Sequence, residues 1–280
     1  MCGQREFEIA GFADAGEPDV LLLHSHDYNE IFLLAMVKRV AKRLPAPRRP
    51  ILPGKDPKLT RERLWAAALE QIDRRGLESF SLRDLARTLG VYPRAIYWHV
   101  KNRNDLLSGM VAYALRDVYP PASSADWKTW IRKLLHQYRK ALQKHPNIAP
   151  LIGASILSGG GIGVGTIEVI LSVLSAAGFE GEGLMDAYNV VVAAQVSFIT
   201  LELAALPLED IVSWAEEHKK QISTLDVLRF PVLGRHLPML ANRAFMLRWS
   251  NGTEVPLDSS FKLFVEVVIN GLERALKEGR

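Results

Sequence analysis

The chain has 280 residues, 48% of them hydrophobic and 24% charged, as in an ordinary globular protein that buries a substantial core. Its single cysteine, Cys2, excludes an intramolecular disulfide framework and a zinc site built on thiolates, and it favours a reducing cytoplasm. Residues 36–107 hold seventeen Lys and Arg against seven acidic residues, whereas residues 108–280 hold seventeen of each. This basic block predicts a module that binds a polyanion, unless it is only a solvated face.

The first 58 residues show no periodic pattern that predicts a folded unit. Residues 1–35 carry one Arg and seven acidic residues, and residues 44–58 contain five prolines and a glycine, which exclude regular helix. We interpret residues 1–58 as an N-terminal extension with a Pro-rich basic arm, either following a DNA groove or largely disordered. A second hypothesis is that translation begins at Met36, where the charge changes sign.

From Leu59 onward the apolar spacing is helical almost everywhere, which predicts an all-α fold. Thr60 is placed to cap a first helix that ends near Gly76. The next three predicted helices are 82–89 capped by Ser81, 93 to about 100 opened by Pro93, and a fourth capped by Asn102 or Asn104 that lasts to Tyr119.

The rest of the chain predicts longer helices at 127–144, 148–157, 164–177, 183–206, 208–222, 237–249 and 257–278. The apolar stretch 188–208 has one charge, Glu202, and no basic flanks, so we interpret it as a buried interface helix and expect no membrane partner. Residues 188–206 and 261–276 carry more apolar positions than one face of a monomer needs. They predict a four-helix bundle between two copies in a homodimer.

The stretch 81–100 has the spacing of a helix-turn-helix. Ala86 is small where two helices approach, Gly90 can take the left-handed conformation of a sharp turn, and Ile96 can anchor the second helix. Because this spacing also occurs in some enzymes, its position inside the basic block is the stronger argument for DNA.

Residues 60–107 resemble the N-terminal DNA-binding domain of TetR regulators, and the string IYWHVKNRNDLL at 96–107 carries the likeness most strongly. Residues 127–146 show a weaker likeness to the tetracycline-repressor branch. The resemblance implies an N-terminal three-helix DNA-binding domain at 59–107. It also implies a C-terminal helical domain at 108–280 that binds an effector and dimerises.

A recognition helix presents its first residues to base edges and its later ones to phosphates. We therefore expect Arg94 and, from the preceding helix, Arg83 to contact bases, although both are equally well explained as solvated charges. Tyr92 and Pro93 are expected at a thymine methyl or the backbone. The expected phosphate contacts are Thr60, Arg61, Tyr97, His99, Lys101 and Arg103.

Two neighbours in this motif have simpler interpretations. Trp98 is assigned to packing rather than to DNA. His99 is alternatively an ordinary surface histidine, and no second metal ligand lies four residues from it.

Effector-binding candidates lie on the apolar faces of the central helices, where ordinary core packing is the competing interpretation. They are Tyr119, Trp127, Trp130, Ile131, Leu134, Tyr138, Ile152, Ile156, Ile167 and Leu171. Tyr119, Leu134 and Ile152 stand where the tetracycline branch places polar or magnesium-binding residues. The resemblance therefore argues against a tetracycline–magnesium chelate, and we expect an apolar or aromatic effector with no metal and no cofactor.

The sequence thus predicts a DNA-binding transcriptional regulator, a repressor that a small molecule releases from operator DNA, rather than an enzyme. It contains no G-x-S-x-G or P-loop motif, and the glycines at 159–165 lack the lysine of a phosphate loop. The alternative is a helical ligand- or partner-binding protein with a vestigial DNA-binding domain. Operator binding by the purified protein distinguishes the two.

Overall fold

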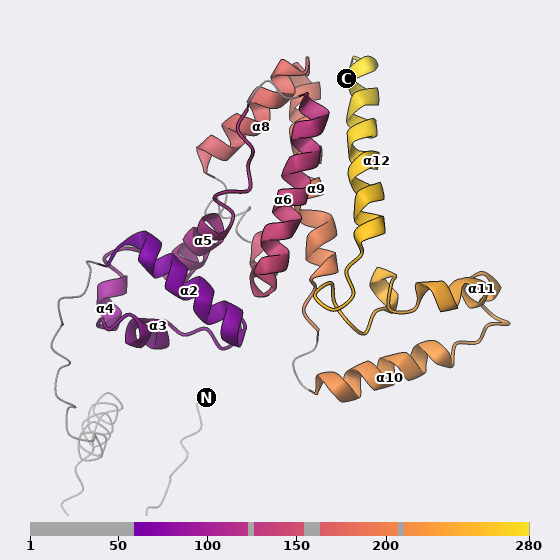
Figure 1. Cartoon of the computed structure of the whole chain (residues 1–280), viewed down its shortest axis with the longest axis horizontal. Coiled ribbons are helices and arrows are strands. Elements are labelled where there is room, and N and C mark those ends of the chain that lie inside the picture. The colour runs from indigo at the N-terminus through magenta and orange to yellow at the C-terminus, as the bar shows by residue number, and fades with distance from the viewer. Residues whose placement is uncertain (1–58, 123–125, 154–162, 207–209, 280) are drawn as a thin grey trace, which may run out of the picture. The chain divides into compact units, whose positions relative to one another are not determined.

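The computed structural model describes residues 59–122, 126–153, 163–206 and 210–279, and every regular element within them is a helix (Figure 1). The predicted all-α fold class is confirmed. The N-terminal extension and basic arm, residues 1–58, lie outside the described residues, and so does Ile156.

Four helices make up the N-terminal region. They are α2 (Arg61–Arg75), α3 (Leu82–Thr88), α4 (Pro93–Ile96) and α5 (Arg103–Ala114). The side chains of Thr60 and Ser81 accept hydrogen bonds from the first turns of α2 and α3, and Asn102 rather than Asn104 caps α5. Helix α2 packs along α5 and against α3, which in turn packs against α4.

The C-terminal region contains six α-helices and two short 3₁₀ turns within the described residues. They are α6 (Trp127–Lys144), η1 (Pro146–Ile148), α8 (Val164–Ala176), α9 (Gly181–Glu202), α10 (Ile211–Ser223), α11 (Pro231–Leu240), η2 (Phe245–Leu247) and α12 (Asp258–Lys277). The predicted helix at 237–249 is wrong, because Pro231 rather than Pro238 occupies the first turn and the helix ends at Leu240.

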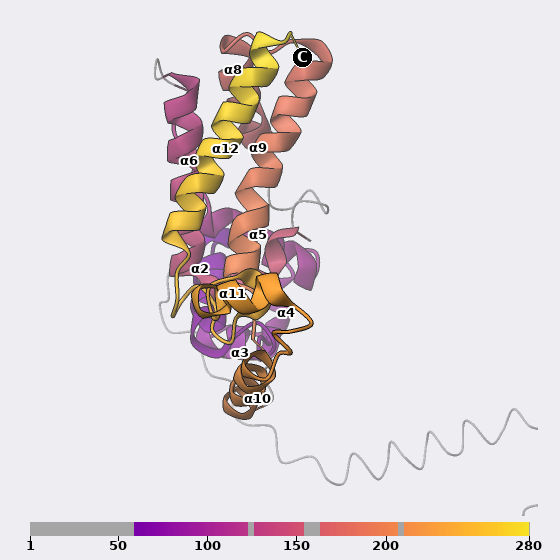
Figure 2. The same ribbon diagram turned by 90° about the vertical axis from the view of Figure 1, so that its right-hand side faces the viewer.

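Helices α6, α9 and α12 lie side by side, with α8 against α6 and α9 (Figures 1 and 2). One buried apolar cluster runs through these helices and continues into α2–α5. Among the described helices, α9 alone is long and apolar enough to cross a membrane by length and composition. In the described structure α9 packs against α6, α8 and α12.

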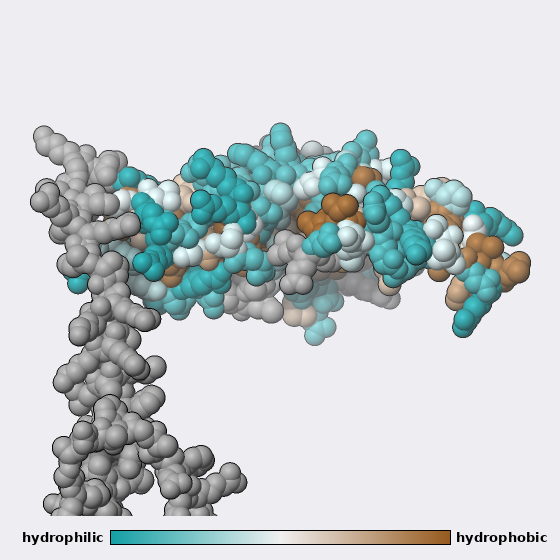
Figure 3. Space-filling model, turned by 90° about the horizontal axis from the view of Figure 1, so that it is seen from below, coloured by the Kyte–Doolittle hydropathy of each residue, from teal (hydrophilic) through white to brown (hydrophobic). Residues whose placement is uncertain are grey.

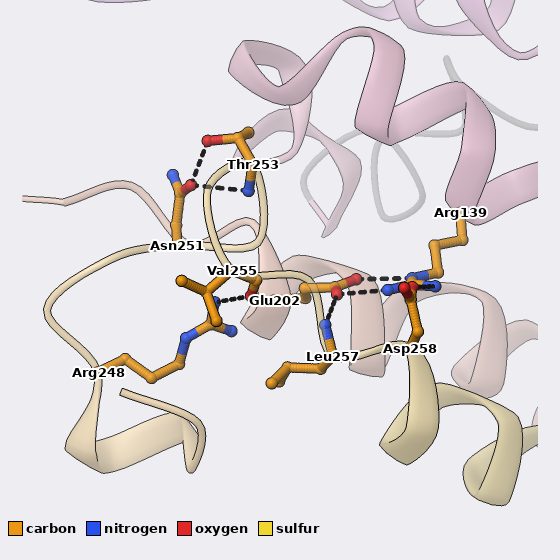
Figure 4. Close-up of polar contacts among 8 residues, drawn as sticks. All are labelled: Arg139, Glu202, Arg248, Asn251, Thr253, Val255, Leu257 and Asp258. Atoms are coloured by element: carbon orange, nitrogen blue, oxygen red, sulfur yellow. Dashed lines mark hydrogen bonds and ion pairs between the residues drawn. The ribbon is translucent and has the colours of Figure 1, made fainter. Parts of the chain in front are cut away.

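A buried polar cluster joins α6, α9 and the start of α12 (Figure 4). Glu202 is fully buried, and its carboxylate accepts from Arg139 Nε at 2.8 Å, from Arg139 Nη2 at 2.6 Å and from the Leu257 backbone nitrogen at 2.7 Å. Arg139 also donates to Asp258 at 2.8 Å. Gly252 approaches so closely that a Cβ there would lie 2.3 Å from Glu202 Cγ. The cluster therefore fixes the loop before α12 to the ends of α6 and α9.

Candidate DNA-binding surface and effector region

The turn between α3 and α4 is built by the three residues that the spacing predicted. Ala86 and Ile96 are buried, and Gly90 has a φ of +70°, which strains any residue with a Cβ. The Val91 nitrogen donates to the Ala86 carbonyl at 3.0 Å and the Gly90 nitrogen to the Arg87 carbonyl at 3.2 Å, so the end of α3 is a Schellman motif. The predicted helix-turn-helix is therefore present.

The recognition helix is shorter than expected. Its α-helical part ends at Ile96, and tight turns continue to Val100, whose nitrogen donates to the Ile96 carbonyl at 3.2 Å. Arg94 and Tyr97 point to solvent, and Tyr97 is 53% exposed. Both side chains are thus on a surface that a duplex can reach.

The other predicted DNA contacts lie in or beside helices α2 to α5. Thr60, Arg61, Arg83, Tyr92, Pro93, Lys101 and Arg103 are exposed, and His99 is half-buried. Arg61 Nε donates to the His99 carbonyl at 3.0 Å, which joins the first turn of α2 to the end of the recognition segment. Arg103 lies over the Phe80 ring, 5.6 Å from its centroid. The structure brings Arg61 and His99 together, and each DNA contact stays a prediction.

The assignment of Trp98 to packing is wrong. Its side chain is 86% exposed, between the exposed Tyr97 and the half-buried His99. The core position in this turn belongs to Val100, which is 4% exposed. The sequence favoured packing because tryptophan is a large apolar residue, but the tight turns after Ile96 point it outward.

Most of the predicted effector residues that the structure describes are buried. Trp130, Ile131, Leu134, Tyr138 and Ile152 are each 4% exposed or less. Tyr119, Trp127, Ile167 and Leu171 are partly buried. A cavity of about 670 Å³ between α2, α5 and α6 has none of these nine residues in its wall, and neither has one of about 300 Å³ between α9 and α12. The burial of these five residues agrees with the competing interpretation of core packing, while effector binding by them stays a prediction.

The polar atoms of these aromatic residues are used inside the protein. Trp130 Nε1 donates to the Pro120 carbonyl at 3.0 Å, and the Tyr119 hydroxyl accepts from Gln195 Nε2 at 3.3 Å. Burial raises the pKa of the Tyr138 hydroxyl, and the neighbouring Tyr119 raises it further. These groups therefore stabilise the helix contacts in their neutral forms. Within the described residues, no three His, Cys, Asp or Glu side chains are grouped to hold a metal ion.

Sequence reasoning did not identify the residues around Glu202. Its one signal was Glu202 as the single charge in the apolar stretch 188–208, since a buried charge requires a partner. The partner, Arg139, is 63 positions away, and no local pattern connects the two.

Two apolar surfaces are left uncovered by the described helices. The 300 Å³ groove between α9 and α12 includes Val190 and Val267, which are 43% and 60% exposed. Apolar side chains also gather on the segment from α10 to α11, where Figure 3 shows hydrophobic surface at one end of the molecule. They include Val212, Val227, Leu228, Val232 and Met239.

Comparison with known proteins agrees with this architecture. The profile described as "Bacterial regulatory proteins, tetR family" matches residues 64–110, and "Tetracyclin repressor-like, C-terminal domain" matches residues 120–276. An HTH-type transcriptional regulator of Saccharopolyspora erythraea is 32% identical over 124 residues, covering 44% of this chain and 52% of that protein. The tetracycline repressor protein class D of Escherichia coli is 33% identical over 91 residues, covering 31% and 42%.

The chain thus spans about half the length of the curated relatives it matches. Among solved structures, apo ActR from Streptomyces coelicolor has a TM-score of 0.59 at 22% identity and covers 80% of this chain and 100% of its own. This likeness shows the fold. Because the C-terminal profile alone matches more than half of the residues, the chain belongs to the tetR family of bacterial regulatory proteins.

Proposed function

We propose that this protein is a homodimeric transcriptional repressor. Residues 59–107 form its DNA-binding domain, and residues 108–280 form its effector-binding and dimerisation domain. The carrying observation is that Arg94, Tyr97 and Lys101 are exposed within and directly after a helix-turn-helix whose Ala86 and Ile96 are buried. The curated relatives that match are transcriptional regulators and tetracycline repressors, which supports a role at DNA.

The roles of the exposed residues follow from their place on the helices. Arg94 and Arg83 reach base edges, because they stand at the starts of α4 and α3. Tyr97, His99, Lys101 and Arg103 contact phosphates and fix the register of the helix without reading sequence. Thr60, Arg61, Tyr92 and Pro93 support the backbone contacts around them.

Footprinting on the intergenic DNA beside the protein's own gene tests the proposal, followed by a comparison of two variants. Arg94→Ala is expected to lose about 1–3 kcal/mol of discrimination between operator and altered sequences. Lys101→Ala is expected to weaken binding to all sequences alike and to lower the salt dependence. Weak binding without sequence preference by the wild-type protein would instead support a helical ligand- or partner-binding protein.

The groove between α9 and α12 supports the homodimer. Its exposed valines lie on two neighbouring helices, so two copies can form a four-helix bundle. Val267→Lys places a charge in this groove, and light scattering is then expected to give the mass of one chain instead of two. Lys262→Ala, a substitution on the same helix outside the groove, should leave the dimer intact. A wild-type monomer would contradict the proposal.

For the effector we propose an apolar or aromatic small molecule that favours a conformation unable to hold DNA. Two observations support this class: the central helices are rich in aromatic residues, and ActR, which has the same fold, is solved in complex with actinorhodin. Aromatic compounds that release the protein from its operator in a mobility-shift assay would identify the effector. The cytoplasm is the proposed location, because operator DNA is there.

A further inference from the structure

Helix α2 connects the proposed DNA-binding surface to a corner of the C-terminal region. At one end, Arg61 Nε donates to the His99 carbonyl in the recognition segment. At the other end, α2 packs against η1, the turn that follows α6. Fifteen residues of regular helix span roughly 22 Å, so α2 is a stiff element that contacts both regions.

Two side chains from the end of α6 and from η1 hold this far end of α2. Asn147 Nδ2 donates to the Ile72 carbonyl at 2.9 Å and to the Asp73 carbonyl at 3.2 Å. His145 Nδ1 lies 2.7 Å from Asp73 Oδ2. The side chain of His145 is 14% exposed and that of Asp73 29% exposed, so both are partly shielded from water, and both line the 670 Å³ cavity. We call Asp73, His145 and Asn147 the α2 latch.

The latch is separate from the packing that folds the N-terminal region. Helix α2 is anchored by Leu64, Ala68 and Ile72, which are fully buried, and its C-terminal end is closed by the Gly76 nitrogen, 2.8 Å from the Ile72 carbonyl. The Ile72 carbonyl already accepts from Gly76, and the Asp73 carbonyl lies in the last turn, where carbonyls have no partner within the helix. The Asn147 amide therefore adds hydrogen bonds to this end of α2 that are not needed to form it. Losing the latch is therefore expected to change the direction of α2 more than its stability.

We infer that His145 and Asn147 are positioning residues for operator binding, which rests on the proposed function. They fix the angle between α2 and the C-terminal helices, and the Arg61–His99 contact passes this angle on to the recognition segment. A rotation of about 5° at the latch moves the other end of a 22 Å helix by roughly 2 Å. A dimer on two half-sites one helical turn apart cannot absorb such a shift without losing contacts.

Asn147→Ala tests the inference on three DNA duplexes: the operator, the operator with one base pair inserted between its half-sites, and an unrelated sequence. The wild-type dimer is expected to lose most of its selective affinity on the inserted operator. For Asn147→Ala we expect about tenfold weaker binding to the operator, equivalent to 1.4 kcal/mol, and a clearly smaller further loss on the inserted one. Affinity for the unrelated sequence should stay within about twofold, because phosphate contacts do not depend on half-site spacing.

Two substitutions of His145 distinguish a positioning role from a purely structural one. His145→Leu removes the ring nitrogen that faces Asp73, whereas His145→Asn places an amide nitrogen near the same position. We expect His145→Leu to relax the spacing preference as Asn147→Ala does, and His145→Asn to restore most of it. Gln143→Ala is the matched control, since Gln143 is a neutral amide near the end of α6 with no hydrogen bond to any described residue of α2.

The outcomes separate the inference from the proposed function. If the wild-type protein shows no preference for any operator, the proposed function fails and the inference fails with it. If the wild type is selective and both Asn147→Ala and His145→Leu keep its spacing preference, only the inference is overturned. Equal losses on the operator and on the unrelated sequence, with unchanged spacing preference, also overturn it, since they indicate a damaged DNA surface.

Discussion

The N-terminal helices α2–α5 and the C-terminal helices α6–α12 use their large side chains in opposite ways. In the first region the aromatic and basic residues singled out from the sequence, such as Tyr97 and Arg94, lie on the surface. In the second region the residues singled out, such as Trp130 and Ile131, are buried in the core. A DNA-reading helix has to expose its functional side chains, so a sequence motif locates them directly. A pocket among packed helices has no such local signature, because apolar residues fill cores and line pockets alike.

Substituting one buried and one exposed tryptophan gives the strongest test of this difference between the two regions. Trp130→Ala removes a side chain that is 2% exposed and is expected to lower the free energy of unfolding by about 3–5 kcal/mol. Trp98→Ala removes one that is 86% exposed and should change it by no more than about 0.5 kcal/mol. Denaturant titration of both variants measures the difference. Equal losses for the two variants would contradict the packing role given to Trp130.

The buried ion pair between Arg139 and Glu202 provides a second test, in the C-terminal region. Glu202→Gln keeps the shape of the side chain but leaves Arg139 with only Asp258, whose side chain is 64% exposed, as its acidic partner. We expect a loss of about 3 kcal/mol of stability, near the lower end of the cost of breaking a buried pair. Glu266→Gln, at the more exposed pair with Arg132, is the control and should cost much less stability. Thermal unfolding of the two variants compares them, and equal midpoints would contradict the role given to Glu202.

The smallest expected effect concerns an exposed ion-pair network. Lys128 and Lys277 hydrogen-bond to Glu273 and lower its pKa from 4.5 to about 2. Because the folded-state pKa is the lower one, this carboxylate stabilises the fold above about pH 4.5, and the contribution is lost as the pH falls towards 2. Glu273→Gln should therefore lower the unfolding midpoint slightly at pH 7, and the difference from wild type should shrink steadily below pH 4.5. A difference that does not change with pH would exclude this explanation.

Local signals predicted most of the helices because their causes are local. The side chains of Thr60, Ser81 and Asp126 each accept a hydrogen bond from the backbone amide three residues later. Because donor and acceptor are close in the chain, the sequence predicts these caps. The error at 231–249 arose where two prolines, Pro231 and Pro238, both suit a first helical turn.

By itself the sequence determined the all-helical fold, the helix-turn-helix and the surface on which Arg94 and Lys101 lie, since capping, a left-handed glycine and apolar spacing act over a few residues. Tertiary structure alone decided that Trp98 is exposed, that Trp130 is core, that Arg139 pairs with Glu202 and that Asn147 holds the end of α2. Each of these depends on contacts or turn geometry that side-chain type does not specify. The two pairings join residues more than 60 positions apart, and no periodic pattern extends over that distance.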